Sequence, residues 1–412
     1  ESLIKSQTRI YMKNKLLALL FKIPIFRIGF RKLFGYITGS SNSSTLISNI
    51  NLNLLKHQKR ILFCYTTKNL NISFEQQDIF HPNIYRVNQM LNVFISLDFC
   101  IDACHCNDML ALDYIKDRRY DYLIGFGKVF CEMANSDNIK EKILFITENN
   151  PEIVNEKFNE RISYFKQRHP NYKTNGFIKR DQFYSIEQFN LANIGICINS
   201  EFNAQSMRKY FKFFYRINVN GFYNNKFIFK KNISEKRKCF VWFGSNGIIH
   251  KGLDILIDVF NKIPDYTLNV YGAPENEIKY LRKEARENII FHGKISVFDE
   301  RFITEVSDKN CFAISLSCSE GMNSGIATCM LHGIIPIVTK ETGFDYQPFM
   351  IEISNFRVDN VINTLLKLKE IDDCELEKMS LETYIYAQKE LTLENFDKKF
   401  RLIFSDIINK ND

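Results

Sequence analysis

The sequence predicts an α/β protein with two Rossmann-like domains that face each other across a cleft. At 412 residues the chain is long for a single hydrophobic core, which favours two domains of ordinary size. Apolar runs of strand length alternate with stretches of helical periodicity from residue 60 onward, and the same alternation restarts near residue 240. Such alternation is typical of parallel sheets that are covered on both faces and bind ligands at the carboxyl ends of their strands.

The composition describes a globular protein with a mild excess of positive charge. Hydrophobic residues make up 45% of the chain, charged residues make up 25%, and the formal net charge is +8. Lysine and arginine are spread along the chain without an arginine-rich run or a basic motif interleaved with aromatic residues, so we expect no nucleic acid partner. Phosphate-rich small molecules and an anionic membrane surface are the partners that this charge favours.

The cysteines indicate free thiols in a reducing compartment. The chain has eleven cysteines, an odd number, and no recognisable signal peptide, which favours a cytoplasmic protein. The tightest group of metal-ligand types is formed by Cys100, Cys104, His105 and Cys106, but its spacing is not that of a zinc site. We therefore predict no metal site.

Residues 1–45 are expected to form a separate basic, amphipathic segment that ends in a linker rich in serine and asparagine. Its longest apolar run, Leu16 to Phe21, is too short to span a bilayer. Two interpretations stay open for this segment. Either it lies in the interface of the cytoplasmic membrane, on the inner face, where cationic side chains meet anionic headgroups, or it is a pair of helices packed on the body of the protein.

Residues 58–225 are predicted to form the first Rossmann-like domain. Short apolar runs predict strands, and apolar residues at helical spacing predict helices. The expected strands are 61–65, 99–101, 122–125, 143–146 and 194–198, and the expected helices are 83–97 and 155–169, with a polar loop at 66–82. The polar stretch 220–238 is the expected connection to the second domain.

Residues 236–390 are predicted to form the second Rossmann-like domain. Its expected strands are 240–243, 266–271, 289–291, 311–316 and 334–339. The remaining stretch, 391–412, carries Phe396, Phe400 and Phe404 at helical spacing, which predicts an amphipathic C-terminal helix.

A glycine-bearing turn in the second domain is the strongest candidate site. Residues 317–333, Ser-Cys-Ser-Glu-Gly-Met-Asn-Ser-Gly-Ile-Ala-Thr-Cys-Met-Leu-His-Gly, follow an apolar strand and lead into a short helix. Unpaired N–H groups and the positive end of the helix dipole converge at such a turn, so we expect Asn323, Ser324 and Gly325 to present donors to a phosphate. A carboxylate repels phosphate, so Glu320 is expected to accept hydrogen bonds from neighbouring sugar hydroxyls.

A second motif follows the first strand of the second domain. Residues 243–254 read Phe-Gly-Ser-Asn-Gly-Ile-Ile-His-Lys-Gly-Leu-Asp. The glycines allow the backbone to approach a ligand closely, with donors expected at Asn246 and Gly247. Lys251 is expected to meet a diphosphate as a point charge, whereas His250 is interpreted as structural. Two such motifs at strand ends of one sheet predict a phosphate pocket.

The first of these motifs resembles the Glu-x7-Glu region of retaining glycosyltransferases with the GT-B fold, the large family 4 type. The matching residues are Glu320, Gly321, Gly333 and Pro336. Thr328 stands in place of the second glutamate, which grips the nucleotide ribose in that family, and Ser245 stands where the family pattern has an arginine. The resemblance implies the GT-B architecture, in which a C-terminal helix crosses back to the first domain.

The resemblance also implies roles for individual residues. Glu320 and Lys251 are the implied catalytic residues, and the loops after the next two strands would line the base pocket. The implied donor-binding residues are Gly244, Ser245, Asn246, Gly247, Gly272, Gly293, Lys294, Ile295, Gly321, Met322, Asn323, Ser324, Gly325 and Thr328. The first domain would bind the acceptor, and its candidate residues at strand ends and a helix start are His81, Asn83, Gly127 and Glu148.

The implied activity is a metal-independent, retaining transfer of a hexose-type sugar from a nucleotide-diphosphate donor to a glycan or lipid-linked acceptor, in bacterial surface polysaccharide biosynthesis. The nucleotide sugar is a substrate, and no separate cofactor is expected. Lys251 and the glycine turn would stabilise the leaving diphosphate. Two alternatives stay open: a non-catalytic GT-B scaffold or partner subunit, because Thr328 replaces the second acid, and a sugar-nucleotide epimerase on the same fold.

Overall fold

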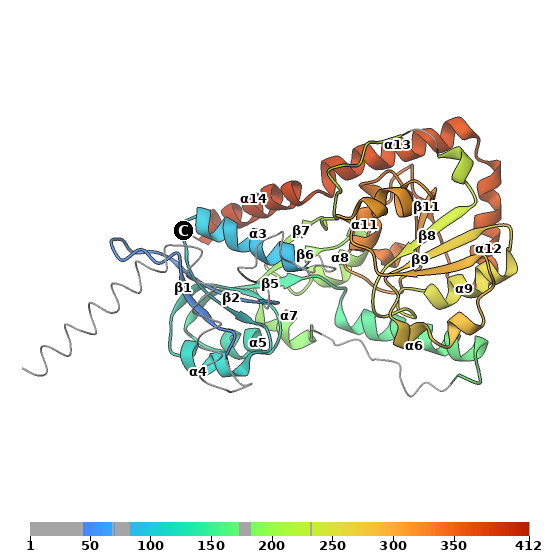
Figure 1. Ribbon diagram of the computed structural model, residues 1–412. Coiled ribbons are helices and arrows are strands. Elements are labelled where there is room, and N and C mark those ends of the chain that lie inside the picture. The colour runs from blue at the N-terminus through green and yellow to red at the C-terminus, as the bar shows by residue number, and fades with distance from the viewer. Residues whose placement is uncertain (1–43, 68–69, 71–82, 173–182, 231–232, 412) are drawn as a thin grey trace, which may run out of the picture. The chain divides into compact units, whose positions relative to one another are not determined.

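The computed structural model describes residues 44–67, 70, 83–172, 183–230 and 233–411 (Figure 1). The basic segment predicted at the start of the chain, the candidate His81 and most of the polar loop 66–82 lie outside these residues. All eleven cysteines lie within them and are free thiols, as expected.

The first sheet has seven strands within the described residues, in the order β1-β3-β2-β4-β5-β6-β7. The strands are β1 (Ile47–Ile50), β2 (Arg60–Tyr65), β3 (Cys100–His105), β4 (Tyr120–Gly125), β5 (Ile139–Ile146), β6 (Ile194–Ile198) and β7 (Phe213–Ile217). All neighbours pair in parallel except β1, which runs antiparallel to β3 at the edge. The five strands that the sequence predicts here are confirmed, whereas β1 and β7 were not predicted.

The second sheet has six strands within the described residues, all parallel, in the order β10-β9-β8-β11-β12-β13. They are β8 (Cys239–Phe243), β9 (Thr267–Tyr271), β10 (Ile289–Gly293), β11 (Phe312–Ser315), β12 (Ile335–Val338) and the short β13 (Ile351–Glu352). The predicted class, α/β with two consecutive parallel sheets, is confirmed.

Helices connect the strands of both sheets (Figure 1). They are α3 (Asn83–Ser96), α4 (Leu112–Ile115), α5 (Lys128–Ala134), α6 (Pro151–Arg168), α7 (Ile186–Leu191), α8 (Glu201–Arg208), α9 (Leu253–Lys262), α10 (Glu275–Ile278), α11 (Ser324–Met330), α12 (Val358–Lys367), α13 (Asp373–Glu390) and α14 (Leu393–Asn411), with a π-helix at Phe302–Ser307. Short 3-10 turns lie at Met109–Ala111, Ser234–Lys236, Leu281–Lys283, Lys340–Thr342 and Leu368–Glu370.

The C-terminal helix α14 crosses back to the first sheet, as the resemblance implies. It follows α13 directly in the chain and packs beside α3 (Figure 1). The ring of Phe94 on α3 lies 5.8 Å from that of Phe400 and 4.9 Å from that of Phe404, measured between centroids. The Tyr215 hydroxyl of β7 donates a 2.7 Å hydrogen bond to Asp406. Aromatic packing of this kind is worth about 0.5–1.5 kcal/mol per pair beyond the area it buries, so the crossing is a substantial contact.

Helix α6 makes a crossing that the sequence did not indicate. It follows β5 of the first sheet, yet it lies along α9 of the second (Figure 1). Near its carboxyl end, Arg168 forms ion pairs with Asp254 and Asp258 of α9. The helix itself begins as the local sequence requires, because the Asn150 side chain caps it by accepting from the Glu152 N–H group at 3.0 Å. Local signals therefore set where α6 begins, and tertiary packing sets which sheet it covers.

Candidate active site

Two loops at the carboxyl edge of the second sheet carry the predicted donor residues. We call residues 244–252, after β8, the lysine loop, and residues 317–323, after β11, the glutamate turn. The strands β8 and β11 are parallel neighbours, so the two loops leave the sheet at the same edge. The Cys318 N–H group donates to the His250 carbonyl at 2.8 Å, and the Cys318 Sγ atom lies 3.4 Å from His250 Nδ1. The structure therefore brings the two motifs together.

Glu320 is nearly buried at the centre of this arrangement, with an exposed fraction of 8%. One carboxylate oxygen, Oε1, lies 3.7 Å from His250 Nε2 and accepts a long, 3.5 Å hydrogen bond from the Ser317 hydroxyl. Its main-chain N–H group donates to the Glu341 carbonyl at 2.9 Å. His250 thus connects both loops through its carbonyl and its ring, which agrees with the structural role that the sequence suggests.

The glutamate turn also touches the first sheet. A Cβ atom added at Gly321 would lie 2.3 Å from the Thr147 carbonyl oxygen and 2.8 Å from that of Ile198, at the ends of β5 and β6. The acceptor-side candidate Glu148 follows Thr147 and is buried. The structure therefore places Glu148 beside the glutamate turn, where the carboxyl ends of both sheets meet.

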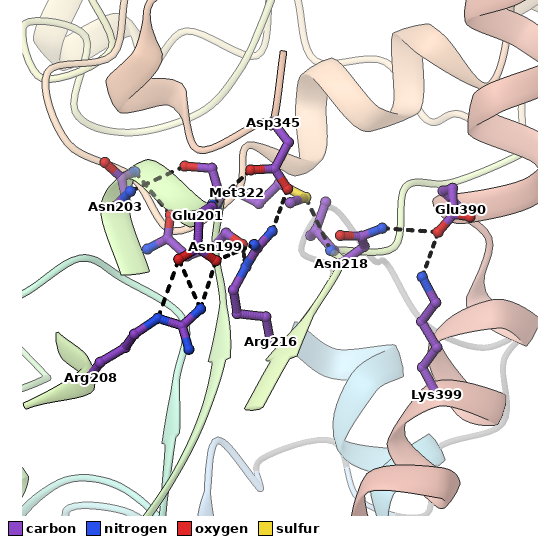
Figure 2. A network of polar contacts seen from close by, with 12 residues as sticks. Asn199, Glu201, Asn203, Arg208, Arg216, Asn218, Met322, Asp345, Glu390 and Lys399 are labelled. Carbon is purple, nitrogen blue, oxygen red and sulfur yellow. Dashed lines mark hydrogen bonds and ion pairs between the residues drawn. The ribbon is translucent and has the colours of Figure 1, made fainter. Parts of the chain in front are cut away.

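A polar network holds the glutamate turn against the first sheet (Figure 2). Asn203 of α8 donates to the Glu320 carbonyl at 3.2 Å, and the Val219 N–H group donates to the Met322 sulfur at 3.3 Å. Arg216 of β7 pairs with Asp345 of the second half and, at 2.7 Å, with Glu201 of the first. Sequence analysis missed Asn203, Arg216 and Asp345, and no local signal distinguishes them from surface residues.

The lysine loop presents Lys251 in its last turn before α9. The Lys251 Nζ atom donates a 3.1 Å hydrogen bond to the hydroxyl of Ser245, the residue that replaces the arginine of the family pattern. Ser245 and Asn246 are exposed. The expected donor at Gly247 is already occupied, because the Gly247 and Ile248 N–H groups both donate to the Glu277 carboxylate of α10, at 2.9 and 3.0 Å. A phosphate at these two groups would have to replace Glu277.

The start of α11 differs from the expectation of open donors. The Asn323 side chain accepts hydrogen bonds from the Gly325 N–H group at 2.9 Å and from the Ile326 N–H group at 3.1 Å. The Asn323 N–H group itself donates to the Thr342 carbonyl at 3.2 Å. Asn323 is therefore the N-cap of a seven-residue helix, and it satisfies donors that the sequence assigned to phosphate.

Thr328, which stands where the family pattern has its second glutamate, is buried in the structure. Its exposed fraction is 1%. The hydroxyl donates to the Ser324 carbonyl at 2.8 Å and accepts from the Phe222 N–H group at 3.0 Å. Thr328 thus fixes the connection between the two sheets to α11, and its hydroxyl donor and one of its two acceptor positions are occupied within the protein.

His332 fixes the same connection one helical turn later. Its Nδ1 atom lies 2.7 Å from the Thr328 carbonyl oxygen, and its Nε2 atom accepts from the Asn224 N–H group at 3.2 Å. A carbonyl needs a donor and an N–H group needs an acceptor, so the imidazole is neutral with its proton on Nδ1. Burial lowers the pKa of His332 to about 4.

We expect this histidine to make stability fall in mild acid. Because the pKa is about 6.5 in the unfolded chain and about 4 in the folded one, the unfolded state binds the proton first as the pH falls through this window. The free energy of unfolding should drop by about 3 kcal/mol across it. Urea unfolding of wild type and His332→Gln, which keeps a donor and an acceptor but does not titrate, measures this. Equal pH slopes for the two proteins would refute the assignment.

The loops assigned to the base pocket lie beside the lysine loop. The Gly272 N–H group donates to the Gly293 carbonyl at 2.7 Å, and the Gly244 N–H group donates to the Tyr271 carbonyl at 3.1 Å. Gly272 has a φ of +80°, and an added Cβ would lie 2.0 Å from the Gly244 carbonyl oxygen, so only glycine fits. Of the neighbouring candidates, Lys294 is exposed and Ile295 is buried.

Two of the remaining acceptor-side candidates, Gly127 and Asn83, lie within the described residues at the starts of helices in the first half of the chain. The Gly127 N–H group donates to the Gln188 side chain at 3.1 Å, and Gly127 has a φ of +89° at the start of α5, so its role is to make a tight turn. Asn83 begins α3. No group of three or more histidine, cysteine, aspartate or glutamate side chains suited to a metal ion occurs among the described residues. None of the helices described is long and apolar enough to cross a membrane.

Comparisons with known proteins support the fold. No family model and no curated protein sequence matches this chain. Among solved structures, it is similar to sucrose-phosphate synthase from Thermosynechococcus elongatus, at 11% identity over 86% of this chain and 100% of that one, with a TM-score of 0.60. HepE from Anabaena, in complex with UDP and glucose, matches at 12% identity over 85% and 100%, with a TM-score of 0.55. WaaG, a glycosyltransferase involved in lipopolysaccharide biosynthesis, matches at 12% over 84% and 99%, with a TM-score of 0.54.

These similarities extend over both sheets and over essentially the whole of each matched protein. At this level of identity they show the architecture alone. The chain therefore has the GT-B fold, as the resemblance of its glutamate turn implies.

Proposed function

We propose that this chain is a retaining glycosyltransferase that moves a hexose-type sugar from a nucleotide-diphosphate donor to a glycan or lipid-linked acceptor. The observation that carries the proposal is the meeting of the lysine loop and the glutamate turn, linked by the 2.8 Å Cys318–His250 hydrogen bond, at the place where both sheets end. The matched structure of HepE, which holds UDP and glucose, supports a nucleotide-sugar donor.

The proposed mechanism assigns one task to each group. The Lys251 ammonium would neutralise charge that develops on the leaving diphosphate, which is the main electrostatic demand of this transfer. Glu320 would accept hydrogen bonds from hydroxyls of the donor sugar, and His250 would hold its carboxylate in place. Glu148 would orient the acceptor from the first sheet. The charge on Lys251 would serve in place of a metal ion, so turnover should survive a chelator.

The test is turnover by the full chain with a panel of uridine, guanosine and adenosine diphosphate sugars and a lipid or glycan acceptor extract. Release of the nucleoside diphosphate that depends on acceptor, and a product that keeps the anomeric configuration of the donor by NMR, would support the proposal. Conversion of the donor to an epimeric sugar product without acceptor would instead indicate an epimerase. Absence of both binding and release with every donor would refute a nucleotide-sugar enzyme.

A non-catalytic scaffold is the second candidate, and one observation favours it. The residue in place of the second glutamate, Thr328, is buried, and its hydroxyl donates to Ser324 and accepts from Phe222 within the protein. Nucleotide binding without turnover for any donor would select this alternative. A role in bacterial surface polysaccharide biosynthesis belongs to the first candidate and is supported by the similarity to WaaG.

We further propose that the protein binds an anionic membrane surface and takes its acceptor there. The loop between β1 and β2 exposes 85% of Leu54 and 95% of Leu55, beside the exposed Lys56. Such leucines gain about 1.5–3 kcal/mol each when fully buried in an apolar environment. The basic segment 1–43 precedes this loop in the chain and would add attraction to anionic lipids.

We expect Leu54→Ser with Leu55→Ser to weaken binding to vesicles of phosphatidylglycerol and phosphatidylcholine by about 10-fold or more. Leu402→Ser on α14, where the leucine is also exposed, is the matched control and should change nothing. Flotation measures the bound fraction. Equal binding by the double variant and the control would refute a membrane contact through this loop.

A further inference from the structure

Arg161 is a fully buried charged side chain next to the proposed site. It lies on α6, in the first half of the chain, and its exposed fraction is 0%. Its guanidinium group donates to the Leu316 carbonyl at 2.8 Å and to the Ile249 carbonyl at 3.4 Å, and it lies 4.3 Å from the ring centroid of Phe356. Leu316 comes directly before the glutamate turn, and Ile249 lies two residues before Lys251.

The burial of this arginine has to be compensated. Moving a guanidinium out of water is costly, and burial lowers the pKa of Arg161. Among the described residues its hydrogen bonds go to the main-chain carbonyls of Ile249 in the lysine loop and of Leu316 just before the glutamate turn, and its Nε atom is buried without a partner. An apolar side chain would fill this position at lower cost if packing were its only task. What the guanidinium adds is a rigid fork of donors that reaches two chain segments at once.

Helix α6, the lysine loop and the residue before the glutamate turn are tightly packed where they meet. A Cβ atom added at Gly252 would lie 2.6 Å from Leu316 Cβ and 2.9 Å from Arg161 Nη1. One turn earlier on α6, the ring of Phe158 lies 6.1 Å from the ring of His250. The face of α6 that carries Phe158 and Arg161 therefore packs against both loops. The helix begins three residues after Glu148.

We infer that Arg161 is a positioning residue that fixes the distance between Lys251 and Glu320 by holding the carbonyls of Ile249 and Leu316. It does not touch the substrate. The effect of Arg161 on catalysis rests on the proposed function. Its hydrogen bonds to the Ile249 and Leu316 carbonyls do not depend on that function. Because α6 leads directly from the end of β5, Arg161 also ties the donor loops to the strand that ends beside Glu148.

The experiment compares Arg161→Met with Arg168→Met in the full chain. Both remove an arginine from α6, but Arg168 pairs with Asp254 and Asp258 of α9, beyond the end of the lysine loop. Amide hydrogen exchange is followed at Cys318, whose N–H group donates to His250, and at Lys251, whose N–H group donates to Gly247. Binding of UDP and GDP is measured by calorimetry on the same proteins.

We expect Arg161→Met to speed exchange at both amides and to weaken nucleoside diphosphate binding, each by about 10-fold, because one to two net hydrogen bonds are lost. Arg168→Met should lower thermal stability and leave both readouts near wild type. Unchanged exchange in Arg161→Met, or equal changes in the two variants, would overturn the inference. If wild type binds no nucleoside diphosphate, the proposed function fails while the exchange comparison still decides the role of Arg161. Arg161→Gln replaces Arg161→Met should the latter not fold.

Discussion

Gly343→Ala should destabilise the protein by about 3–5 kcal/mol and abolish turnover, because the new methyl group would meet the main chain of the glutamate turn. An added Cβ would lie 1.6 Å from the Gly321 carbonyl oxygen and 2.6 Å from its carbonyl carbon, and Gly343 has a φ of +92°. The left-handed backbone costs an alanine about 1–2 kcal/mol, and the remainder comes from the clash. Main-chain atoms cannot rotate away as a flexible side chain does, so the turn that carries Glu320 must move.

Gly293→Ala is the matched control for this prediction. Gly293 also has a left-handed backbone, with a φ of +75°, but an added Cβ there would meet nothing within 4 Å. Only the backbone term of about 1–2 kcal/mol applies. Urea unfolding measures both variants under the same conditions. A loss in Gly343→Ala no larger than that in Gly293→Ala would mean that residue 343 does not pack on the glutamate turn.

Lys251→Ala should lower kcat by about 100- to 1000-fold, the usual effect of removing one group that stabilises developing negative charge. Lys251 is half-buried at the start of α9, and its Nζ atom is held by Ser245 at 3.1 Å. Its ammonium group is the cation of the lysine loop, so no other side chain of that loop can replace it. Lys251→Arg keeps the charge and should recover part of the activity.

Lys262→Ala is the control, since Lys262 lies in the last turn of the same helix and pairs with Asp359 at 3.5 Å on the surface. It should keep kcat within about twofold, because an exposed pair contributes little. Steady-state release of nucleoside diphosphate measures both variants, and calorimetry separates binding from turnover. Wild-type kcat in Lys251→Ala would remove Lys251 from the mechanism and leave the scaffold as the better candidate.

The proposed site uses many of its own polar groups to hold itself together. Glu277 occupies two N–H groups of the lysine loop, and Asn323 occupies two at the start of α11. These contacts make the loops rigid without a ligand. They also mean that these four N–H groups could donate to a diphosphate only if Glu277 or Asn323 were displaced.

The sequence alone determined the class of fold and the edge of the sheet on which the site lies. Buried parallel strands read as short apolar runs, so β2, β8 and β11 were visible in the sequence. Because neighbouring parallel strands end at one edge, two motifs that each follow a strand had to meet, and Glu320 and Lys251 were proposed as site residues in this way. The left-handed Gly333, with a φ of 72°, was likewise fixed by local sequence.

Tertiary structure alone decided which polar groups remain for a ligand. Whether Thr328 faces a ribose or Phe222, and whether the Gly247 N–H group faces a phosphate or Glu277, depends on segments far apart in the chain. The packing of α6 also depends on distant segments. Its periodicity shows that it has an apolar face but not which sheet that face covers. The position of Arg161 on that face, between Phe158 and Phe165, was the one feature of the sequence that could have indicated a buried arginine. Hydrogen-bond partners are chosen by packing, and packing is not encoded in any single stretch of sequence.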